Sequence, residues 1–571
     1  MENSQDLHSS DSPSDNQVAS SPTHQRPPEK WKKGGRLLSG LIGSNVLLFS
    51  CTLITVVFTK ELDMWETDLL IYLSVLMLIC ILWMCFQMYF SYMYNGAVTY
   101  KDCRAGPIWM RGSIVLFGIG TIIMNGFRII NSARRLHCPN YIINIIHPAI
   151  HATFVIVQTY FLWVSCKHCV QMYVNSTRCG LMFLLTVNLT IWVIAVIEEA
   201  RHHTLQMERY LEANSSVTMN TEHEEHSEIS ESSHCNSIRR FLPISFIYLY
   251  PFYIEYNLLS AAMVYIMWKN VGRQIDDDTS HHHGLGPGIR EHIPIFGLFS
   301  GVTILVTGLV MFILYEVGRE HNKPDLLSLT VFYYFHVISL SLMSLATMVG
   351  ISIFRLDKRR MDNEKNPSRT LDMTLLLSTT LAQYGISYYS IIATVASPPL
   401  KLLSSLSLTY SLLMIVQHTL QNTFIIEGLH RLPPHLRLNS HGQSNHPTFQ
   451  NRQGQRKHVT IQEMEEVSCV QEHEDPPIAR RLSRRATFTA HIRKHLKKRK
   501  TLKDIYLFLF LSNIIFWILP AFGGWICFDT GLEVKFFGFF MWAVITNICL
   551  PFGIFYRMHA AANLLELYSM T

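Results

Sequence analysis

The chain has 571 residues, of which 49% are apolar and only 16% are charged, a balance that is rare in soluble proteins of this size. Its twelve cysteines are scattered, and no CxxC motif pairs with a second one at zinc spacing, so neither a disulfide framework nor a structural metal site is indicated. The net charge of +6 has its source in Lys and Arg crowded into 478–503, beside an apolar segment, which favours lipid headgroups over nucleic acid as the anionic neighbour.

The chain begins with a polar segment and continues as a series of long apolar windows. Residues 1–35 start rich in Ser and Pro, without an apolar signal region, and we expect a disordered cytosolic tail. A membrane-spanning helix needs roughly 20 apolar residues, because ~30 Å of hydrocarbon is crossed at ~1.5 Å per residue. Twelve windows qualify: 37–58, 68–92, 108–131, 142–165, 180–198, 243–268, 294–316, 328–354, 372–395, 402–426, 503–525 and 535–557. Because these runs are too long and too evenly apolar for barrel strands, they predict an all-α polytopic membrane protein with twelve transmembrane helices.

Lys and Arg in the short loops indicate the orientation in the membrane. The segment 30–36 and the loop 355–369 are rich in both residues, so we expect them to be cytosolic. This places the N- and C-termini in the cytosol of a multi-pass cell-membrane protein. The Asn214 glycosylation sequon then lies outside, as it should. One loop disagrees, the loop after the third window, which carries Arg128, Arg134 and Arg135.

Two long polar segments divide the chain into similar halves. An external loop at about 200–240 and a disordered cytosolic loop at about 428–502 each lie next to the fifth window of six. We therefore predict two six-helix domains, 36–270 and 294–571, joined by a cytosolic linker at 271–293.

Short motifs recur in the same order in both halves. PFxIxY is found at 251–256 and 551–556, and the patterns Asn-x-x-x-Trp and Gln-x-x-Phe also occur twice. With six helices in each half, this predicts a parallel repeat about an axis along the membrane normal. The repeat places three neutral polar residues in each half: Gln158, Asn188 and Tyr256, and Gln421, Asn513 and Tyr556. They could either hold helices together or line a hydrated path.

Ionisable residues inside the windows are the sharper candidates for proton movement. Glu255 lies at mid-window, where burial would favour its neutral form and allow it to exchange protons near neutral pH; alternatively it could be buried and paired for structure. His559 could relay protons or contact headgroups. Further candidates close the fifth window or lie in the twelfth: Glu198, Glu199 and Arg557.

Five histidines of the expected external loop could sense acid or bind an inhibitory zinc ion, although a solvated, flexible loop is the default interpretation: His202, His203, His223, His226 and His234. No GK[ST] phosphate loop, arginine ladder, TVGYG filter or HExxH motif is present, so ATP-driven, voltage-gated and zincin classes are set aside, and no enzyme activity or cofactor is expected.

Four stretches of the chain resemble the otopetrin family: WKKGGRLL at 31–38, GPIWMR at 106–111, VQTYFLWVS at 157–165 and NICLPFGIFYRMHA at 547–560. The resemblance extends over all twelve windows. The resemblance implies a proton-selective channel opened by extracellular acid. It also implies a homodimer of subunits with two six-helix domains each, around a centre filled by membrane lipid, with sterol among the candidates.

The resemblance also implies roles for particular residues. Family triads of Gln, Asp or Asn, and Tyr fall on the two polar sets given above, and the family's membrane Glu and C-terminal His fall on Glu255 and His559. If the family carries Asp at position 188, the neutral Asn188 here cannot titrate. Two other interpretations remain: a proton-coupled secondary transporter of a small solute, and a scaffold whose polar residues only pack helices.

Overall fold

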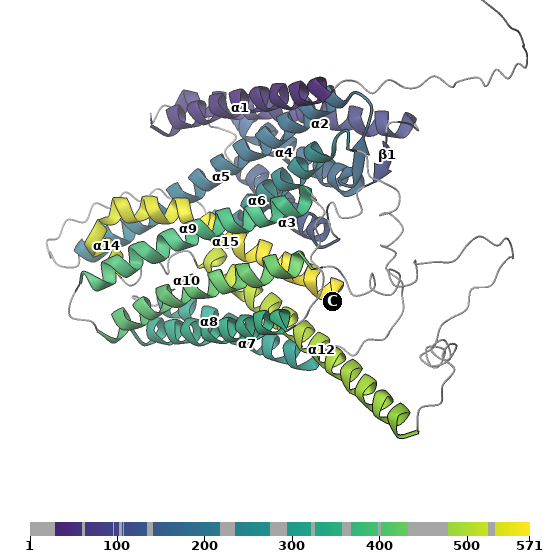
Figure 1. The fold of residues 1–571 in the computed structure, drawn as a ribbon. Coiled ribbons are helices and arrows are strands. Elements are labelled where there is room, and N and C mark those ends of the chain that lie inside the picture. The colour runs from purple at the N-terminus through teal and green to yellow at the C-terminus, as the bar shows by residue number, and fades with distance from the viewer. Residues whose placement is uncertain are drawn as a thin grey trace, which may run out of the picture.

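The computed structural model describes residues 29–59, 63–94, 96, 98–101, 106, 108–133, 141–216, 234–273, 294–320, 326–356, 367–397, 401–431, 478–523 and 531–571. Nearly all of this part of the chain is helical (Figure 1). The predicted all-α fold class is therefore confirmed. One feature was not expected, a two-stranded antiparallel sheet of β1 (Val98–Lys101) and β2 (His168–Val170).

The N-terminal half contributes six long helices: α1 (Glu29–Thr59), α2 (Asp63–Met93), α3 (Ile108–Ala133), α4 (Tyr141–Ser165), α5 (Val174–Ser216) and α6 (His234–Asn270). The C-terminal half contributes six more and one short helix: α7 (Ile295–Glu320), α8 (Leu326–Arg355), α9 (Pro367–Val395), α10 (Leu402–Leu429), α12 (Ile478–Phe522), α14 (Leu532–Phe537) and α15 (Phe539–Met570). α14 and α15 are separated by Gly538, whose φ of 82° suits glycine and interrupts the helix.

Each of the twelve apolar windows coincides with one long helix, the last one beginning in α14 and continuing in α15. By length and composition, nine helices in the described part of the chain could cross a membrane: α1 to α5, α7, α8, α12 and α15. The long helices α6, α9 and α10 fall short of the required hydropathy. They carry many of the buried polar side chains described below, which lower hydropathy without shortening the helix. Twelve crossings are consistent with this fold.

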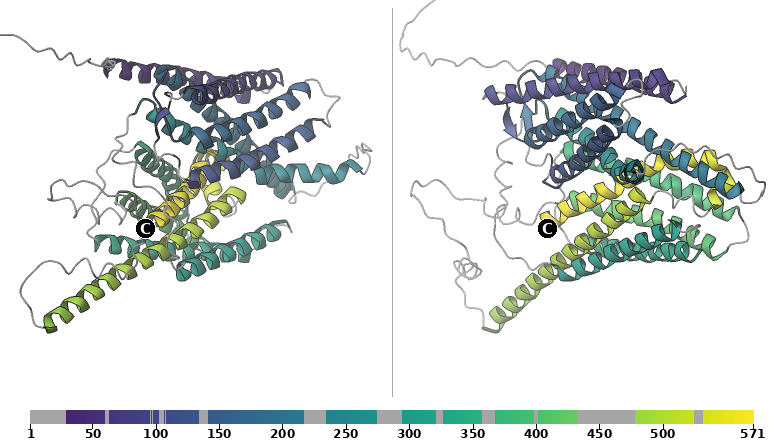
Figure 2. Two further views of the ribbon diagram at one scale, coloured as in Figure 1. Left: turned by 90° about the vertical axis from the view of Figure 1, so that its right-hand side faces the viewer. Right: turned by 180° about the vertical axis from the view of Figure 1, so that it is seen from behind.

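Three helices extend into segments that we expected to be loops. α5 continues to Ser216 and α6 begins at His234, so helix occupies most of the expected external loop. α12 begins at Ile478, within the stretch expected to be disordered, and its first turns protrude from the bundle (Figures 1 and 2). The cause is local: 478–502 and 199–216 contain no Gly or Pro and many strong helix formers, so the adjoining helices propagate through them.

The two halves pack corresponding helices against each other in the same pattern. α5 packs against α1 and α6, as α12 packs against α7 and α15. α4 lies between α2 and α3, as α10 lies between α8 and α9, and α3 contacts α6 as α9 contacts α15. A parallel six-helix repeat would produce this arrangement. The halves meet through α3, α5 and α6 on one side and α9, α12 and α15 on the other.

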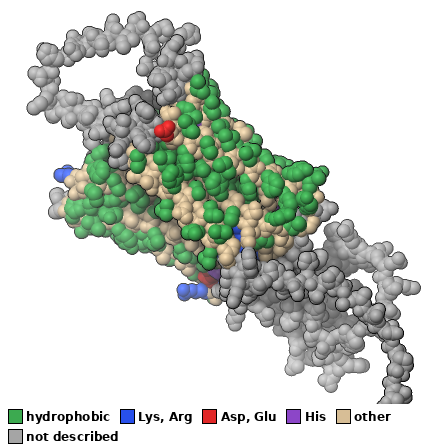
Figure 3. Space-filling view, turned by 90° about the horizontal axis from the view of Figure 1, so that it is seen from above, with side chains coloured by type: hydrophobic (Ala, Val, Ile, Leu, Met, Phe, Trp, Pro, Cys, Tyr) green, Lys and Arg blue, Asp and Glu red, His purple; other side chains and the backbone are tan. Residues whose placement is uncertain are grey.

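The described surface is largely apolar, with charged side chains at its margins (Figure 3). Large hydrophobic side chains are exposed on both halves, among them Leu82 at 70% and Phe296 at 78%. Apolar surface on this scale requires a cover, and lipid provides it for a polytopic membrane protein. The start of α1 and the C-terminus lie at the same end of the bundle, as an even number of crossings requires (Figure 1).

Candidate functional site

In the N-terminal half, Gln158 of α4 and Asn188 of α5 form a reciprocal pair of amides. Gln158 Nε2 donates to Asn188 Oδ1 at 2.8 Å, and Asn188 Nδ2 donates to Gln158 Oε1 at 3.1 Å. Asn188 also donates to the Leu184 carbonyl one turn earlier in its helix. Both side chains are fully buried. Their mutual hydrogen bonds therefore satisfy polar atoms that water does not reach.

Tyr256 of α6 lies on the same side of α4 but outside this pair. Its hydroxyl donates to the Val155 carbonyl at 3.1 Å and lies 3.0 Å from the Thr159 hydroxyl. Within the described residues, no hydrogen bond joins Tyr256 to Gln158 or Asn188. The first predicted triad is therefore an amide pair with a tyrosine anchored beside it.

In the C-terminal half, the predicted triad is complete. Gln421 and Asn513 exchange hydrogen bonds of 3.1 and 3.0 Å, and Gln421 Nε2 also donates to the Tyr556 hydroxyl at 3.2 Å. Tyr556 donates in turn to Asn422 Oδ1 at 2.9 Å, and Asn422 donates to Thr380 of α9 at 2.8 Å. The network therefore joins α9, α10, α12 and α15.

A buried cation distinguishes this network from the one in the N-terminal half. Arg557 Nη1 donates to Gln417 Oε1 and Asn513 Oδ1, both at 3.1 Å, and the guanidinium lies over the Phe516 ring at 4.9 Å. Arg557 is only 3% exposed, and none of the described carboxylates forms a salt bridge with it. By the PFxIxY register its counterpart is the neutral Asn257. At this position the two halves therefore differ by one positive charge.

Glu255 lies at the junction of the two halves. It is 1% exposed, and neither carboxyl oxygen has a hydrogen-bond partner in the described structure. The indole of Trp517, from α12 of the other half, approaches the carboxyl without reaching hydrogen-bond geometry. A carboxyl can bind a proton and release it, and ionisable groups inside a membrane commonly mark proton paths, so Glu255 remains a candidate for carrying a proton.

Aromatic contacts at this junction follow the repeat. Trp517 packs against Phe252 of the PFYIEY motif at 6.2 Å, and Trp192 packs against Phe552 of the PFGIFY motif at 5.4 Å. Each half therefore inserts its tryptophan beside the other half's motif. The carboxyl of Glu255 faces one of these tryptophans, whereas the other motif carries Phe555 at the equivalent position.

His559 is buried rather than exposed to headgroups. It is 2% exposed, its Nε2 lies 3.2 Å from the Asp372 carbonyl oxygen and 3.8 Å from the Asp372 carboxylate, and its ring stacks on Phe555 at 5.7 Å. The headgroup interpretation is therefore wrong for this residue. An imidazole beside a carboxylate can accept and release a proton, so His559 remains a candidate.

Arg128, which we had counted as a loop charge, lies within α3 and pairs with Glu198 of α5. The two groups are 2.9 Å apart, and Tyr250 donates to the same carboxylate. The guanidinium also lies over the Tyr253 ring at 5.3 Å. This pairing removes Arg128 from the loop that disagreed with the orientation, and it accounts for Glu198 as an ion-pair partner.

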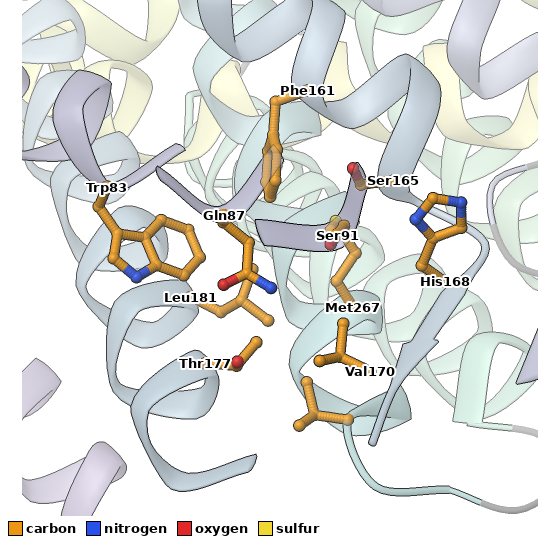
Figure 4. A pocket seen from close by; sticks show the side chains of 11 residues that line it. Trp83, Gln87, Ser91, Phe161, Ser165, His168, Val170, Thr177, Leu181 and Met267 are labelled. Carbon is orange, nitrogen blue, oxygen red and sulfur yellow. The ribbon is translucent and has the colours of Figure 1, made fainter. Parts of the chain in front are cut away.

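The N-terminal half contains a pocket at the end of its helix bundle where α2 and α4 finish and α5 begins (Figure 4). Its lining includes Trp83, Gln87, Ser165, Thr177 and Met267, around an empty space of ≈ 300 Å³ that includes its open mouth. Gln87 is 7% exposed and its Nε2 has no hydrogen-bond partner among the described residues. Buried amide hydrogens are rarely left unpaired, so a water molecule that enters from the open mouth is the expected partner of Gln87 Nε2.

Comparison with known proteins identifies the family. The otopetrin family model matches residues 109–240, 212–443 and 465–558. The chain is 42% identical to human "Proton channel OTOP2" over 95% of this chain and 97% of that protein. The chain belongs to the otopetrin family. It is also 36% identical to human "Proton channel OTOP3", over 94% of this chain and 86% of that one, and 30% identical to "Proton channel OTOP1" of Danio rerio, over 94% and 91%.

The histidines that we expect in an external loop of this otopetrin fall mostly outside the described side chains. His202 is exposed on α5, His203 and His234 lie in helices whose side chains are not described there, and His223 and His226 are outside the described residues. In the part of the chain that is described, no group of three or more His, Cys, Asp or Glu residues is placed to hold a metal ion. The zinc hypothesis stays a prediction.

Several buried polar residues of this otopetrin escaped the sequence analysis. Gln417 and Asn422 flank Gln421 at spacings of four and one on the same helix, and their polarity within an apolar window was a usable signal. His147 and His151 are spaced by four residues in the fourth window, which places them on one helix face. The internal repeat does not indicate them, because the C-terminal half has no histidines at the equivalent positions.

Proposed function

We propose that this otopetrin is a proton-selective channel that conducts H⁺ into the cell when the outside is acidified. The observation that supports this most is that relatives matching 94–95% of the chain are named proton channels. Buried polar clusters in both halves are consistent with that activity, since polar groups inside a membrane commonly mark ion paths. No enzymatic step and no cofactor enters this proposal.

In this proposal the proton moves along water molecules held by amide and hydroxyl groups. Gln158 and Asn188 in one half, and Gln421 and Asn513 in the other, offer both donors and acceptors to water at mid-membrane. Tyr256 and Tyr556 lie beside them. Glu255 and His559 bind and release the proton, while Glu199 and Arg557 set the electrostatic field around them. The pocket around Gln87 is the hydrated exit on the cytosolic side.

We propose the cell membrane as the location, with the N- and C-termini in the cytosol. The Lys- and Arg-rich segments at 30–36 and 355–369 support this orientation. We also propose a homodimer of two-domain subunits, 36–270 and 294–571, with membrane lipid and sterol at its centre. The open apolar faces on both halves offer the surface that a second copy and lipid would cover.

Acidifying the outside in sodium-free solution is expected to evoke an inward H⁺ current in cells that express the chain. The reversal potential should follow the pH gradient, because protons are the permeant ion. Whole-cell recording with simultaneous intracellular pH measurement checks this.

A secondary transporter would instead give a flux that saturates and requires a co-transported solute. A reversal potential indifferent to the pH gradient, or a current that appears only when a solute is added, contradicts the channel proposal. A scaffold would give no acid-evoked flux at all.

A further inference from the structure

Two buried histidines on α4 lie on the same helix face as Gln158, nearer to the start of that helix. His151 is 2% exposed and His147 is 8% exposed. His147 Nδ1 lies 3.0 Å from the Ser74 hydroxyl of α2, and His151 Nδ1 lies 2.7 Å from the Asn125 amide of α3. Together with Gln158 they place three polar side chains on one face of α4 over about 16 Å, roughly half of the ~30 Å hydrocarbon thickness.

The second nitrogen of His151 has no hydrogen-bond partner in the described structure. Either orientation of the Asn125 amide satisfies Nδ1, because the amide nitrogen can donate to the ring and the amide oxygen can accept from it. In both cases Nε2 is the nitrogen left over. Buried polar atoms are rarely left unpaired, so a water molecule at Nε2 is the expected partner.

Two ring contacts through Tyr253 link His151 to Arg128, near the end of α3. The His151 ring meets the Tyr253 ring edge-on at 5.3 Å, and the Arg128 guanidinium lies over the Tyr253 ring at 5.3 Å. Arg128 and its partner Glu198 are 19% and 33% exposed, so this pair reaches the solvent-accessible edge of the bundle. From there, Tyr253, His151 and then Gln158 follow one another into the N-terminal half.

The other half has no such pair. The register that aligns Gln158 with Gln421 places Tyr410 and Met414 opposite His147 and His151. The Met414 sulfur accepts from Arg557 at 3.2 Å, so the equivalent position there faces a fixed cation. The histidine pair is a property of the N-terminal half alone.

We propose that His151 is a proton-binding station on the path through the N-terminal half, with Asn125 positioning its ring. With the Asn125 oxygen turned to the ring, Nδ1 keeps its proton and Nε2 accepts the passing proton from one water and releases it to the next. The ring is neutral before and after, so the step is balanced. This inference rests on the proposed channel function.

The test compares His151→Gln with His336→Gln in cells whose wild-type current has been established. His336 is a matched control because it is also buried, at 5% exposure, but its Nδ1 bonds to the Phe332 carbonyl of its own helix. Current per surface channel is expected to fall about tenfold in His151→Gln and to stay near the wild-type value in His336→Gln. His151→Asn is a second variant that is smaller and neutral.

Wild-type current per channel in either neutral His151 variant overturns the proposal. Loss of both variants from the surface, with His336→Gln present there, would mean that the residue serves structure and would also overturn it. A wild-type chain without proton current refutes the channel function itself, which is a separate outcome.

Discussion

Replacing Glu255 with Gln is expected to reduce the acid-evoked current at least about tenfold, because one binding site for the moving proton is lost and each ~1.4 kcal/mol added to the barrier costs a factor of ten. The free energy of unfolding should change little in Glu255→Gln. Neither carboxyl oxygen has a hydrogen bond to lose in the described structure, and Gln has almost the same size. The amide also lacks the charge that burial disfavours.

Current density should be measured together with surface biotinylation, so that conduction is separated from expression. Glu427→Gln is the control for losing a carboxylate that does pair with a cation, since Glu427 pairs with Arg431 at the end of α10, and it is expected to lower surface expression without changing the current per channel. If a cation held Glu255, its neutralisation would leave that cation unpaired at a cost of about 3–5 kcal/mol and lower surface expression. Normal expression with wild-type current per channel would rule out a proton-carrying role.

The helices were predictable because a membrane imposes a length and an apolar composition that are visible in a single sequence. All twelve windows fall on long helices for that reason. The ends of the helices were less predictable. Whether 478–502 is helical depends on propagation from the adjoining apolar segment, and polarity alone suggested a loop. The β1–β2 pair joins residues some 70 positions apart, and neither strand is long enough to show a pattern.

The candidate site was predictable where the repeat marked it and not where the halves differ. The Gln–Asn pairs were found because both halves carry them. The separation of Tyr256 from its pair depends on which neighbour its hydroxyl reaches, and that is a matter of three-dimensional packing. The neighbours of Glu255 could not be predicted either, because Trp517 is far from it in the sequence and belongs to the other half of the chain.

The halves should differ in conduction because their electrostatics differ. Arg557 places a fixed positive charge among Gln417, Asn513 and Met414, with no salt bridge to a described carboxylate. At an effective dielectric constant of about 20, two unit positive charges 4 Å apart repel by about 4 kcal/mol. A proton that approaches the C-terminal amide cluster meets this barrier. The N-terminal cluster carries no such cation, and Asn257 stands at the equivalent position.

Matched substitutions of the two asparagines test this difference. Asn188→Leu is expected to lower the acid-evoked current about tenfold, whereas Asn513→Leu should leave most of it. Leu resembles Asn in length but cannot hydrogen-bond water, so either change makes its cluster less able to hold a water chain. The stability costs differ, because Gln158 loses its amide partner while Gln421 keeps Gln417 and Tyr556. Currents must therefore be divided by surface amount. The opposite ranking, with Asn513→Leu abolishing current and Asn188→Leu sparing it, would place conduction in the C-terminal half and show that Arg557 does not block a proton.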